Sequence, residues 1–179
     1  MAPEETTTDR LTVLSADEIA RRVRELGSEI SGDYRGSADL ILIGVLKGAV
    51  VFLSDLLRAL DLPCEVEFIR VSSYGIERAS SGKVDVLAEI GASLDGKDVI
   101  VVDGIVDSGL TMGFILDHLK SGGKLKSIEV CTLLSKGASA CLGERPKYVG
   151  FEIGDEFVVG YGLDLAEKYR NLPYIAALK

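Results

Sequence analysis

Apolar runs and amphipathic stretches alternate along most of this chain. Five short apolar runs are candidate strands: residues 39–46, 66–71, 99–102, 128–134 and 148–153. The run at 99–102 is entirely β-branched, which is typical of a central strand buried on both faces. Residues 19–30, 49–60 and 112–119 instead place apolar side chains at helical spacing. This alternation predicts an α/β fold with a mainly parallel central sheet and helices on both faces.

The boundaries of the folded region follow from local signals. Ser15 and Glu18 have the spacing of a capping box, so we expect the first helix to begin there and to end near Gly32. Residues 1–10 are polar and acidic, and we expect them to form a disordered tail. No linker, repeat or low-complexity block divides the remainder, so residues 11–179 are predicted to form a single domain.

The composition argues against several classes of function. Twenty basic and 28 acidic residues give a formal net charge of −8, which disfavours nucleic acid as a partner because such binding depends on neutralising phosphates. No apolar stretch approaches the roughly 20 residues that span a bilayer, so we expect no membrane insertion. Cys64, Cys131 and Cys141 show no paired spacing, which favours a reducing cytoplasm over a disulfide framework or a zinc site.

The histidine content narrows the chemistry further. The chain has one histidine, His118, and it lies off the apolar face of its predicted helix, where we expect it to be solvated. Hydrolysis by a serine or cysteine paired with histidine therefore has little support, as does a histidine zinc site. Carboxylate, lysine, arginine and backbone groups remain, and they suit magnesium-assisted chemistry on phosphates.

The segment after the run 99–102 carries groups suited to a phosphorylated sugar. Asp103 and Asp107 lie four residues apart, and small polar residues then lead into the next amphipathic segment. A loop that enters a helix N-terminus presents unpaired N–H groups and a positive dipole end, which favour a phosphate. Two carboxylates beside that phosphate need other partners, and sugar hydroxyls with a divalent cation supply them.

Polar groups also follow other predicted strands. Lys47-Gly48, the segment 103–111 and Lys136 each come directly after an apolar run. Because the carboxyl ends of parallel strands meet at one edge of a sheet, where open α/β proteins bind ligands, we expect these three segments to lie close together.

Residues 99–111 resemble the ribose-phosphate signature of the purine phosphoribosyltransferases: an apolar strand, two acids, two aliphatics, Asp, Ser or Thr, Gly, any residue and Thr. The acidic pair reads Asp103-Gly104 here, so the first acid is shorter than the family's usual Glu and the second is missing. If φ at Gly104 is negative, an aspartate there is expected to tighten magnesium-dependent donor binding. Over residues 11–179 the chain is similar to hypoxanthine-guanine phosphoribosyltransferases of the short bacterial type. The resemblance implies a type I phosphoribosyltransferase-like fold with a small base-binding hood and a flexible lid loop.

The resemblance also implies roles for individual residues. Those for ribose 5-phosphate are Asp103, Asp107, Ser108, Gly109, Leu110 and Thr111. Those for pyrophosphate are Lys47, Gly48 and Arg170, with a non-proline cis peptide before the lysine. Those for the purine are Lys136, Phe157, Val158 and Asp164, and the lid would include Ser73 and Tyr74. Asp103 and Asp164 would hold magnesium, and Asp107 would be the catalytic acid or base that handles a proton of the purine ring.

The reaction implied is purine salvage: transfer of a 5-phosphoribosyl group from phosphoribosyl pyrophosphate to hypoxanthine or guanine, with Mg²⁺ as cofactor. The choice among these bases and xanthine stays open, because all three carry the O6 that Lys136 would recognise. The resemblance further implies a cytoplasmic homodimer or homotetramer. Two alternatives also stay open: a weak or inactive regulator that keeps the fold and binds nucleotide or donor, and a flavodoxin-like receiver.

Overall fold

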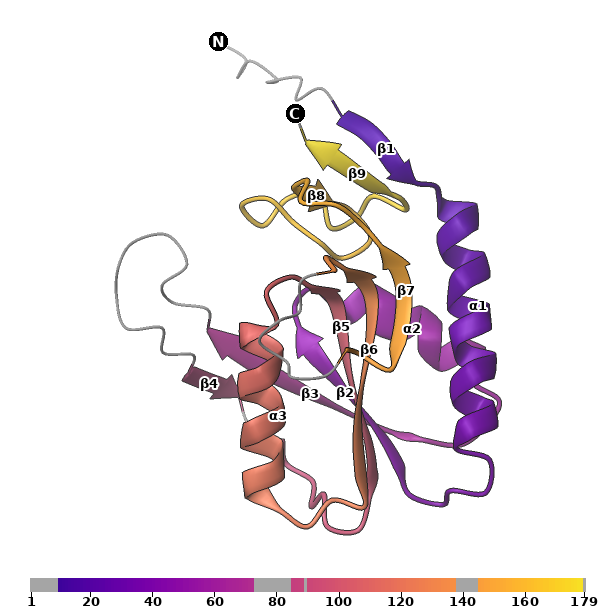
Figure 1. The fold of residues 1–179 in the computed structure, drawn as a ribbon, viewed down its shortest axis with the longest axis vertical. Helices are drawn as coiled ribbons and strands as arrows, with labels where there is room; N and C mark the ends of the chain where they lie inside the picture. The colour runs from indigo at the N-terminus through magenta and orange to yellow at the C-terminus, as the bar shows by residue number, and fades with distance from the viewer. Residues whose placement is uncertain (1–9, 73–84, 89, 138–144, 179) are drawn as a thin grey trace.

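The computed structural model describes residues 10–72, 85–88, 90–137 and 145–178 (Figure 1). The expected lid residues Ser73 and Tyr74 lie outside the described residues, as do Cys141 and residues 1–9 of the expected tail. Arg10, which the sequence assigns to that tail, instead begins a strand and is paired with Leu178.

A six-stranded sheet forms the centre of the molecule, in the order β4-β3-β2-β5-β6-β7. Its strands are β2 (Leu40–Leu46), β3 (Glu65–Ser72), β4 (Asp85–Ala88), β5 (Asp98–Val106), β6 (Ser127–Ser135) and β7 (Tyr148–Glu152). All neighbours pair in parallel except β4, which runs antiparallel to β3. The predicted parallel sheet is confirmed, and β5 lies in its interior between β2 and β6.

Helices cover both faces of this sheet, as the sequence predicts. Helices α1 (Ala16–Asp33) and α2 (Val50–Ala59) pack on one face, and α3 (Leu110–Gly122) packs on the other (Figure 1). Alternate residues of β2 divide between the two cores: Leu40 and Leu42 join α1 and α2, whereas Ile41 and Ile43 join α3. The strand is apolar throughout because side chains of both orientations are buried.

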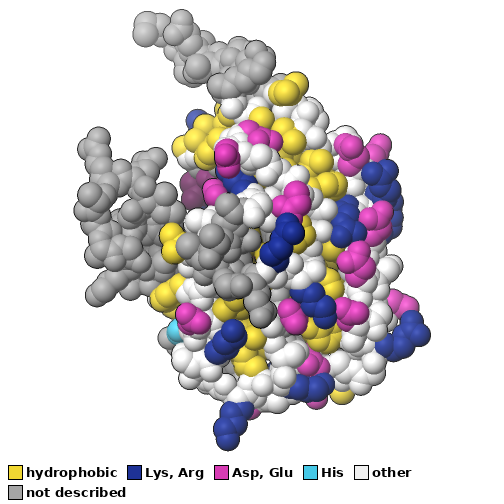
Figure 2. All heavy atoms as spheres, viewed as in Figure 1, with side chains coloured by type: hydrophobic (Ala, Val, Ile, Leu, Met, Phe, Trp, Pro, Cys, Tyr) yellow, Lys and Arg dark blue, Asp and Glu magenta, His cyan; other side chains and the backbone are white. Residues whose placement is uncertain are grey.

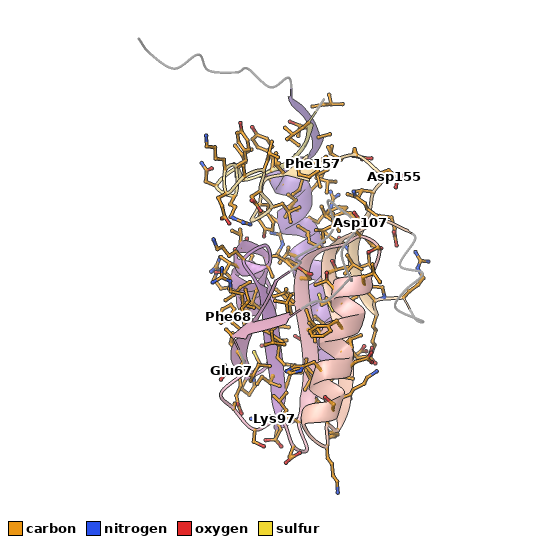
Figure 3. All side chains as sticks on the ribbon, turned by 90° about the vertical axis from the view of Figure 1, so that its left-hand side faces the viewer. Glu67, Phe68, Lys97, Asp107, Asp155 and Phe157 are labelled. Carbon is orange, nitrogen blue, oxygen red and sulfur yellow. The ribbon has the colours of Figure 1, made fainter. Side chains whose placement is uncertain are left out.

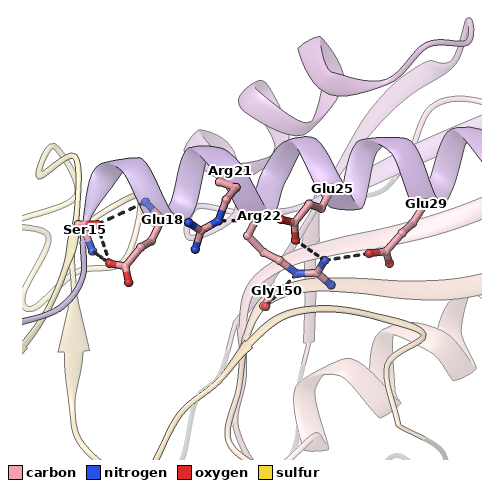
Figure 4. A network of polar contacts seen from close by, with 7 residues as sticks. All are labelled: Ser15, Glu18, Arg21, Arg22, Glu25, Glu29 and Gly150. Carbon is pink, nitrogen blue, oxygen red and sulfur yellow. Dashed lines mark hydrogen bonds and ion pairs between the residues drawn. The ribbon is translucent and has the colours of Figure 1, made fainter.

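The predicted capping box is present at the start of α1. The Ser15 hydroxyl accepts a hydrogen bond from the Glu18 N–H at 3.3 Å, and the Glu18 carboxylate accepts one from the Ser15 N–H at 2.9 Å (Figure 4). Further along the helix, Arg22 donates to the carbonyl oxygen of Gly150 at 3.1 Å and pairs with two acidic side chains of its own helix (Figure 4). Arg22 therefore ties α1 to β7, an edge strand whose outer backbone groups would otherwise lack partners.

A second, three-stranded antiparallel sheet has the order β1-β9-β8. Its strands are β1 (Arg10–Leu14), β8 (Val158–Val159) and β9 (Ile175–Leu178). It lies beyond the carboxyl ends of β5 and β6 (Figure 1), and we call this three-stranded sheet the hood. The hood joins the beginning and the end of the described chain, because β1 pairs with β9.

The surface is mixed in charge. On the face that Figure 2 shows, Lys and Arg side chains are interspersed with Asp and Glu side chains. In the described part of the chain no helix combines the length and the apolar character needed to cross a membrane. His118, which the sequence predicts to be solvated, is half-buried and stacks on Phe114 with ring centroids 6.2 Å apart.

Candidate active site

A cavity of about 470 Å³ opens between the carboxyl ends of β2 and β5 and the segment that joins β8 to β9. Its lining residues are Lys47, Gly48, Asp103, Ile105, Val106, Asp107, Ser108, Gly109, Thr111, Met112, Leu163, Asp164 and Arg170. The predicted pyrophosphate and ribose-phosphate residues therefore lie around one cavity. Leu110 is the exception: it is not among the lining residues and is 61% exposed.

The turn from β5 into α3 has a backbone suited to an anion. Gly109 caps the helix with a φ of 82°, a conformation that glycine adopts freely. The first N–H groups of a helix have no acceptor within the helix. Because Thr111 and Met112 of the first turn line the cavity, an anion there would lie close to the positive end of α3.

Asp103 lies inside β5 and not in the loop that the sequence predicts. The strand continues because its pairing with β6 extends as far as Val106, opposite Ser135. Burial raises the pKa of Asp103 to about 7, although hydrogen bonds from the N–H groups of Gly104 and Ile105 oppose the shift. A cation or a hydroxyl donor in the cavity would favour the charged form of this carboxyl group.

Asp107 and Lys136 lie side by side. The Nζ of Lys136 is 3.3 Å from Oδ2 of Asp107, and the lysine side chain is 13% exposed against 69% for the aspartate. The N–H of Lys136 donates to the carbonyl oxygen of Val106 at 3.0 Å, which fixes the end of β6 against β5. The lysine expected to recognise the base is therefore next to the aspartate expected to move its proton. Figure 3 shows Asp107 and Phe157, the residue before β8, at the same end of the molecule.

The two predicted pyrophosphate cations share one acidic partner. The peptide bond between Leu46 and Lys47 is cis, as expected, and Lys47 Nζ lies 3.0 Å from Oε2 of Glu167. Arg170 Nη2 lies 3.2 Å from the same oxygen and 2.7 Å from Oδ1 of Asp164. Hydrogen bonds from Lys47 and Arg170 hold the pKa of Glu167 below its usual value. Sequence reasoning missed Glu167.

The position of Glu167 depends on an unusual turn. Leu165 and Lys168 exchange backbone hydrogen bonds of 3.1 and 3.0 Å, and the residues between them, Ala166 and Glu167, have φ values of 50° and 63°. Two positive φ values mark a type I′ turn, which usually contains Gly, Asn or Asp. The sequence Ala-Glu gives no sign of such a turn; the one available hint was that Glu167 stands three residues before Arg170.

The carbonyl group of Gly48 is enclosed by two other glycines. A Cβ atom at Gly104 would lie 2.9 Å from Gly48 O, and one at Gly162 would lie 2.5 Å from it. Both distances are shorter than packed atoms tolerate. The residue that replaces the family's second acid is therefore a point of close backbone approach between β5 and the segment after β2.

The remaining purine-site predictions are placed as follows. Phe157 is 52% exposed, and its carbonyl oxygen accepts a hydrogen bond from Leu178 N–H at 3.0 Å. Val158 is buried in β8 opposite Ala177. Neither residue, nor Lys136, is among the described residues that line the cavity, whereas Asp164 is. The purine contacts of these residues stay predictions.

Two carboxylates of the cavity have the chemistry to hold a magnesium ion. Among the described residues, no three His, Cys, Asp or Glu side chains cluster as a metal site. Asp103 and Asp164 nevertheless line the same cavity. Mg²⁺ commonly uses one or two carboxylates, with substrate phosphates and water completing its coordination, so this donor set is sufficient.

Comparison with known proteins identifies relatives. A family model described as a phosphoribosyl transferase domain matches residues 10–166. The hypoxanthine-guanine phosphoribosyltransferase of Bacillus subtilis is 44% identical over 167 residues, which cover 93% of this chain and 92% of that protein. The bifunctional protein TilS/HprT of Listeria innocua is 46% identical over 167 residues, and there the match spans 26% of the relative's length.

The fold is shared with solved structures. The crystal structure of a hypoxanthine-guanine phosphoribosyltransferase from Bacillus anthracis, with HEPES in the active site, superposes with a TM-score of 0.88 at 44% sequence identity. The match covers 94% of this chain and 98% of that one. The hypoxanthine phosphoribosyltransferase of Staphylococcus aureus also gives a TM-score of 0.88, at 41% identity, over 94% of this chain and 91% of that one.

Proposed function

The chain belongs to the phosphoribosyl transferase family, and from this premise we propose that it transfers a 5-phosphoribosyl group from phosphoribosyl pyrophosphate to hypoxanthine or guanine. The products are IMP or GMP and pyrophosphate, as in purine salvage. The observation that carries the proposal is the single cavity lined by the β5–α3 turn, Lys47-Gly48 and Arg170. It suits a donor that has a phosphate, a ribose and a pyrophosphate group.

The β5–α3 turn is assigned to the ribose 5-phosphate. The backbone N–H groups of residues 108–111 would hold the phosphate with the positive end of α3. Asp103 would accept hydrogen bonds from the ribose hydroxyls, and these favour its charged form. Positive charge develops on the ribose as pyrophosphate leaves, so carboxylates that are already oriented in the cavity lower the barrier without rearrangement.

Lys47, Gly48 and Arg170 are assigned to pyrophosphate. The two cations lie near each other already, since both contact Glu167. Asp103 and Asp164 would hold Mg²⁺ together with donor oxygens, and the ion would neutralise part of the charge on the departing group.

Lys136, Phe157, Val158 and Asp164 are assigned to the purine. Lys136 would donate to O6, Phe157 would stack on the ring, and the Val158 backbone would meet its edge. As the C1′–N bond forms and the bond to pyrophosphate breaks, Asp107 would take the proton that the imidazole ring loses. The Nζ of Lys136 lies 3.3 Å from that carboxylate, so the groups proposed to bind O6 and to move the proton are adjacent.

A steady-state assay tests the function directly. Purified protein should convert hypoxanthine or guanine with phosphoribosyl pyrophosphate into nucleotide, and chelation of magnesium should abolish the reaction. Xanthine as third acceptor measures base preference. The comparisons favour this enzyme over an inactive regulator, because the matched curated relatives carry the enzyme's name. Donor binding without turnover for all three bases would instead establish the regulator.

We also propose a cytoplasmic homodimer or homotetramer. The oligomeric state follows from the family resemblance; the exposed apolar side chains of Val50 on α2 and Phe68 on β3, 45% and 40% exposed, are available for such a contact. Light scattering during size-exclusion chromatography measures the assembly, and a monomer at micromolar concentration contradicts this proposal.

A further inference from the structure

Glu167 is the common acidic partner of the two cations assigned to pyrophosphate. One of its oxygens, Oε2, lies 3.0 Å from Lys47 Nζ and 3.2 Å from Arg170 Nη2. These are ordinary distances for charge-assisted hydrogen bonds, and an oxygen of pyrophosphate would bind to the two cations at the same positions. A carboxylate oxygen and a phosphate oxygen cannot both occupy them.

The contact depends on the side chain, while the backbone is fixed. The Glu167 N–H donates to Oδ2 of Asp164 at 2.8 Å, and the turn between Leu165 and Lys168 is closed by two backbone hydrogen bonds. The Glu167 side chain itself is 65% exposed. It can therefore swing into solvent by rotation about its side-chain bonds, without any change in the turn.

The local charge balance shows what this movement would change. Lys47 and Arg170 contribute two positive charges, and Asp164 and Glu167 contribute two negative charges. While Glu167 is in place, the cations are already neutralised. When it swings away, Lys47 loses its ion pair with Glu167, whereas Arg170 keeps its ion pair with Asp164.

We propose that Glu167 is an internal counterion that occupies the pyrophosphate position in the unliganded protein and sets the affinity for pyrophosphate and for the donor. This inference rests on the proposed function. Donor binding displaces the carboxylate from Lys47 and Arg170, and its return after transfer competes with the product pyrophosphate. Glu167 thus weakens the binding of the donor before transfer and of pyrophosphate after transfer. It contacts neither the purine nor the reacting bond.

The test is isothermal titration of inorganic pyrophosphate, with and without Mg²⁺, into the full-length protein and its Glu167→Gln variant. Exposed ion pairs are weak individually, so the loss of two should tighten binding by about three- to tenfold. Added salt should reduce the difference in pyrophosphate affinity between the variant and the parent protein, because it screens the ion pairs of Glu167 with Lys47 and Arg170. In the assay, the KM for donor and the inhibition constant for pyrophosphate should both fall by the same factor, with the KM for hypoxanthine unchanged.

The matched control is Glu65→Gln. Glu65 also pairs with a lysine, Lys97, and the variant also removes one negative charge, but it lies at the start of β3, at the opposite edge of the sheet. Its pyrophosphate affinity should equal that of the parent protein. Glu167→Ala serves as a second variant, since it removes the charge without adding a hydrogen-bonding amide. It should also bind pyrophosphate more tightly than the parent protein.

The possible outcomes distinguish failure of this inference from failure of the proposed function. Equal pyrophosphate affinity in Glu167→Gln and Glu65→Gln would overturn the inference, and so would weaker binding, because Glu167 would then be orienting the cations for the anion. If the parent protein is active while the Glu167 variants show no gain, only this inference fails. If the parent protein neither binds pyrophosphate nor forms nucleotide, the proposed function fails.

Discussion

Replacing Gly104 by alanine tests whether this glycine is needed for packing. Its φ lies outside the left-handed range, so the backbone conformation itself accepts a side chain. The new Cβ atom, however, would lie 2.9 Å from Gly48 O and 3.0 Å from Cδ2 of Leu163. The leucine can rotate, but the carbonyl oxygen belongs to backbone held between β5 and the segment around Gly162. The backbone at Gly48 must therefore move.

The expected cost follows from the size of this clash. Overpacking a well-packed site by one methyl group typically costs about 1–3 kcal/mol. For a domain of this length, each kcal/mol shifts the melting temperature by roughly 2–4 °C. Gly104→Ala should therefore melt about 2–12 °C lower than the parent. The KM for donor should also rise several-fold, because displacement of Gly48 moves the adjoining Lys47.

Thermal unfolding and donor kinetics, measured together, check this prediction. Gly91→Ala is the matched control, since a Cβ atom there meets nothing within 4 Å. The sequence alone predicts that Gly104→Asp strengthens donor binding by restoring the family's acid, whereas the structure predicts weaker binding for the same steric reason. An unchanged melting temperature in Gly104→Ala, or tighter donor binding in Gly104→Asp, would refute the packing argument.

Three further predictions concern single side chains. Asp107→Asn should lower the single-turnover rate by about 10²–10⁴ while nearly preserving donor affinity, because the amide keeps the shape but accepts no proton; a full rate removes Asp107 from proton transfer. Lys136→Ala should raise the KM for hypoxanthine and guanine at least about tenfold, since a charge-assisted hydrogen bond contributes roughly 1.5–3 kcal/mol; a larger effect on donor KM would contradict its assignment to the base. Burial raises the pKa of Asp98, but hydrogen bonds from Lys126, Ser37 and Ser127 outweigh it and lower the pKa below 3.8. Asp98 should therefore stabilise the fold above pH 3.8 and lose that contribution as the pH falls through its lowered pKa, so Asp98→Asn should cost about 1–3 kcal/mol at neutral pH and less in acid. Denaturant unfolding of Asp98→Asn and of the parent protein, at neutral and at acid pH, measures this cost. The same difference in unfolding free energy at both pH values would refute the prediction.

The order of strands and helices could be predicted from the sequence because it is a local property. The β-branched run in β5 and the continuous apolar run in β2 show which side chains leave water, and the capping box at Ser15 and Glu18 indicates hydrogen bonds between residues three apart. The meeting of Lys47 with the β5–α3 turn also followed, since parallel strands align their carboxyl ends at one edge.

The features that only the tertiary structure decided depend on contacts between distant segments. Asp103 belongs to a strand because β6 continues to pair alongside it, and its pKa is raised because neighbouring chain covers it. Glu167 meets Lys47 across 120 residues, through a turn that its own residue types do not predict. In the sequence, Gly104 stands where the family has its second acid. In the fold, it is a point of close contact with the backbone of Gly48. Spacing along a chain gives the periodicity of one element, but the space left beside a residue is determined by the element packed against it.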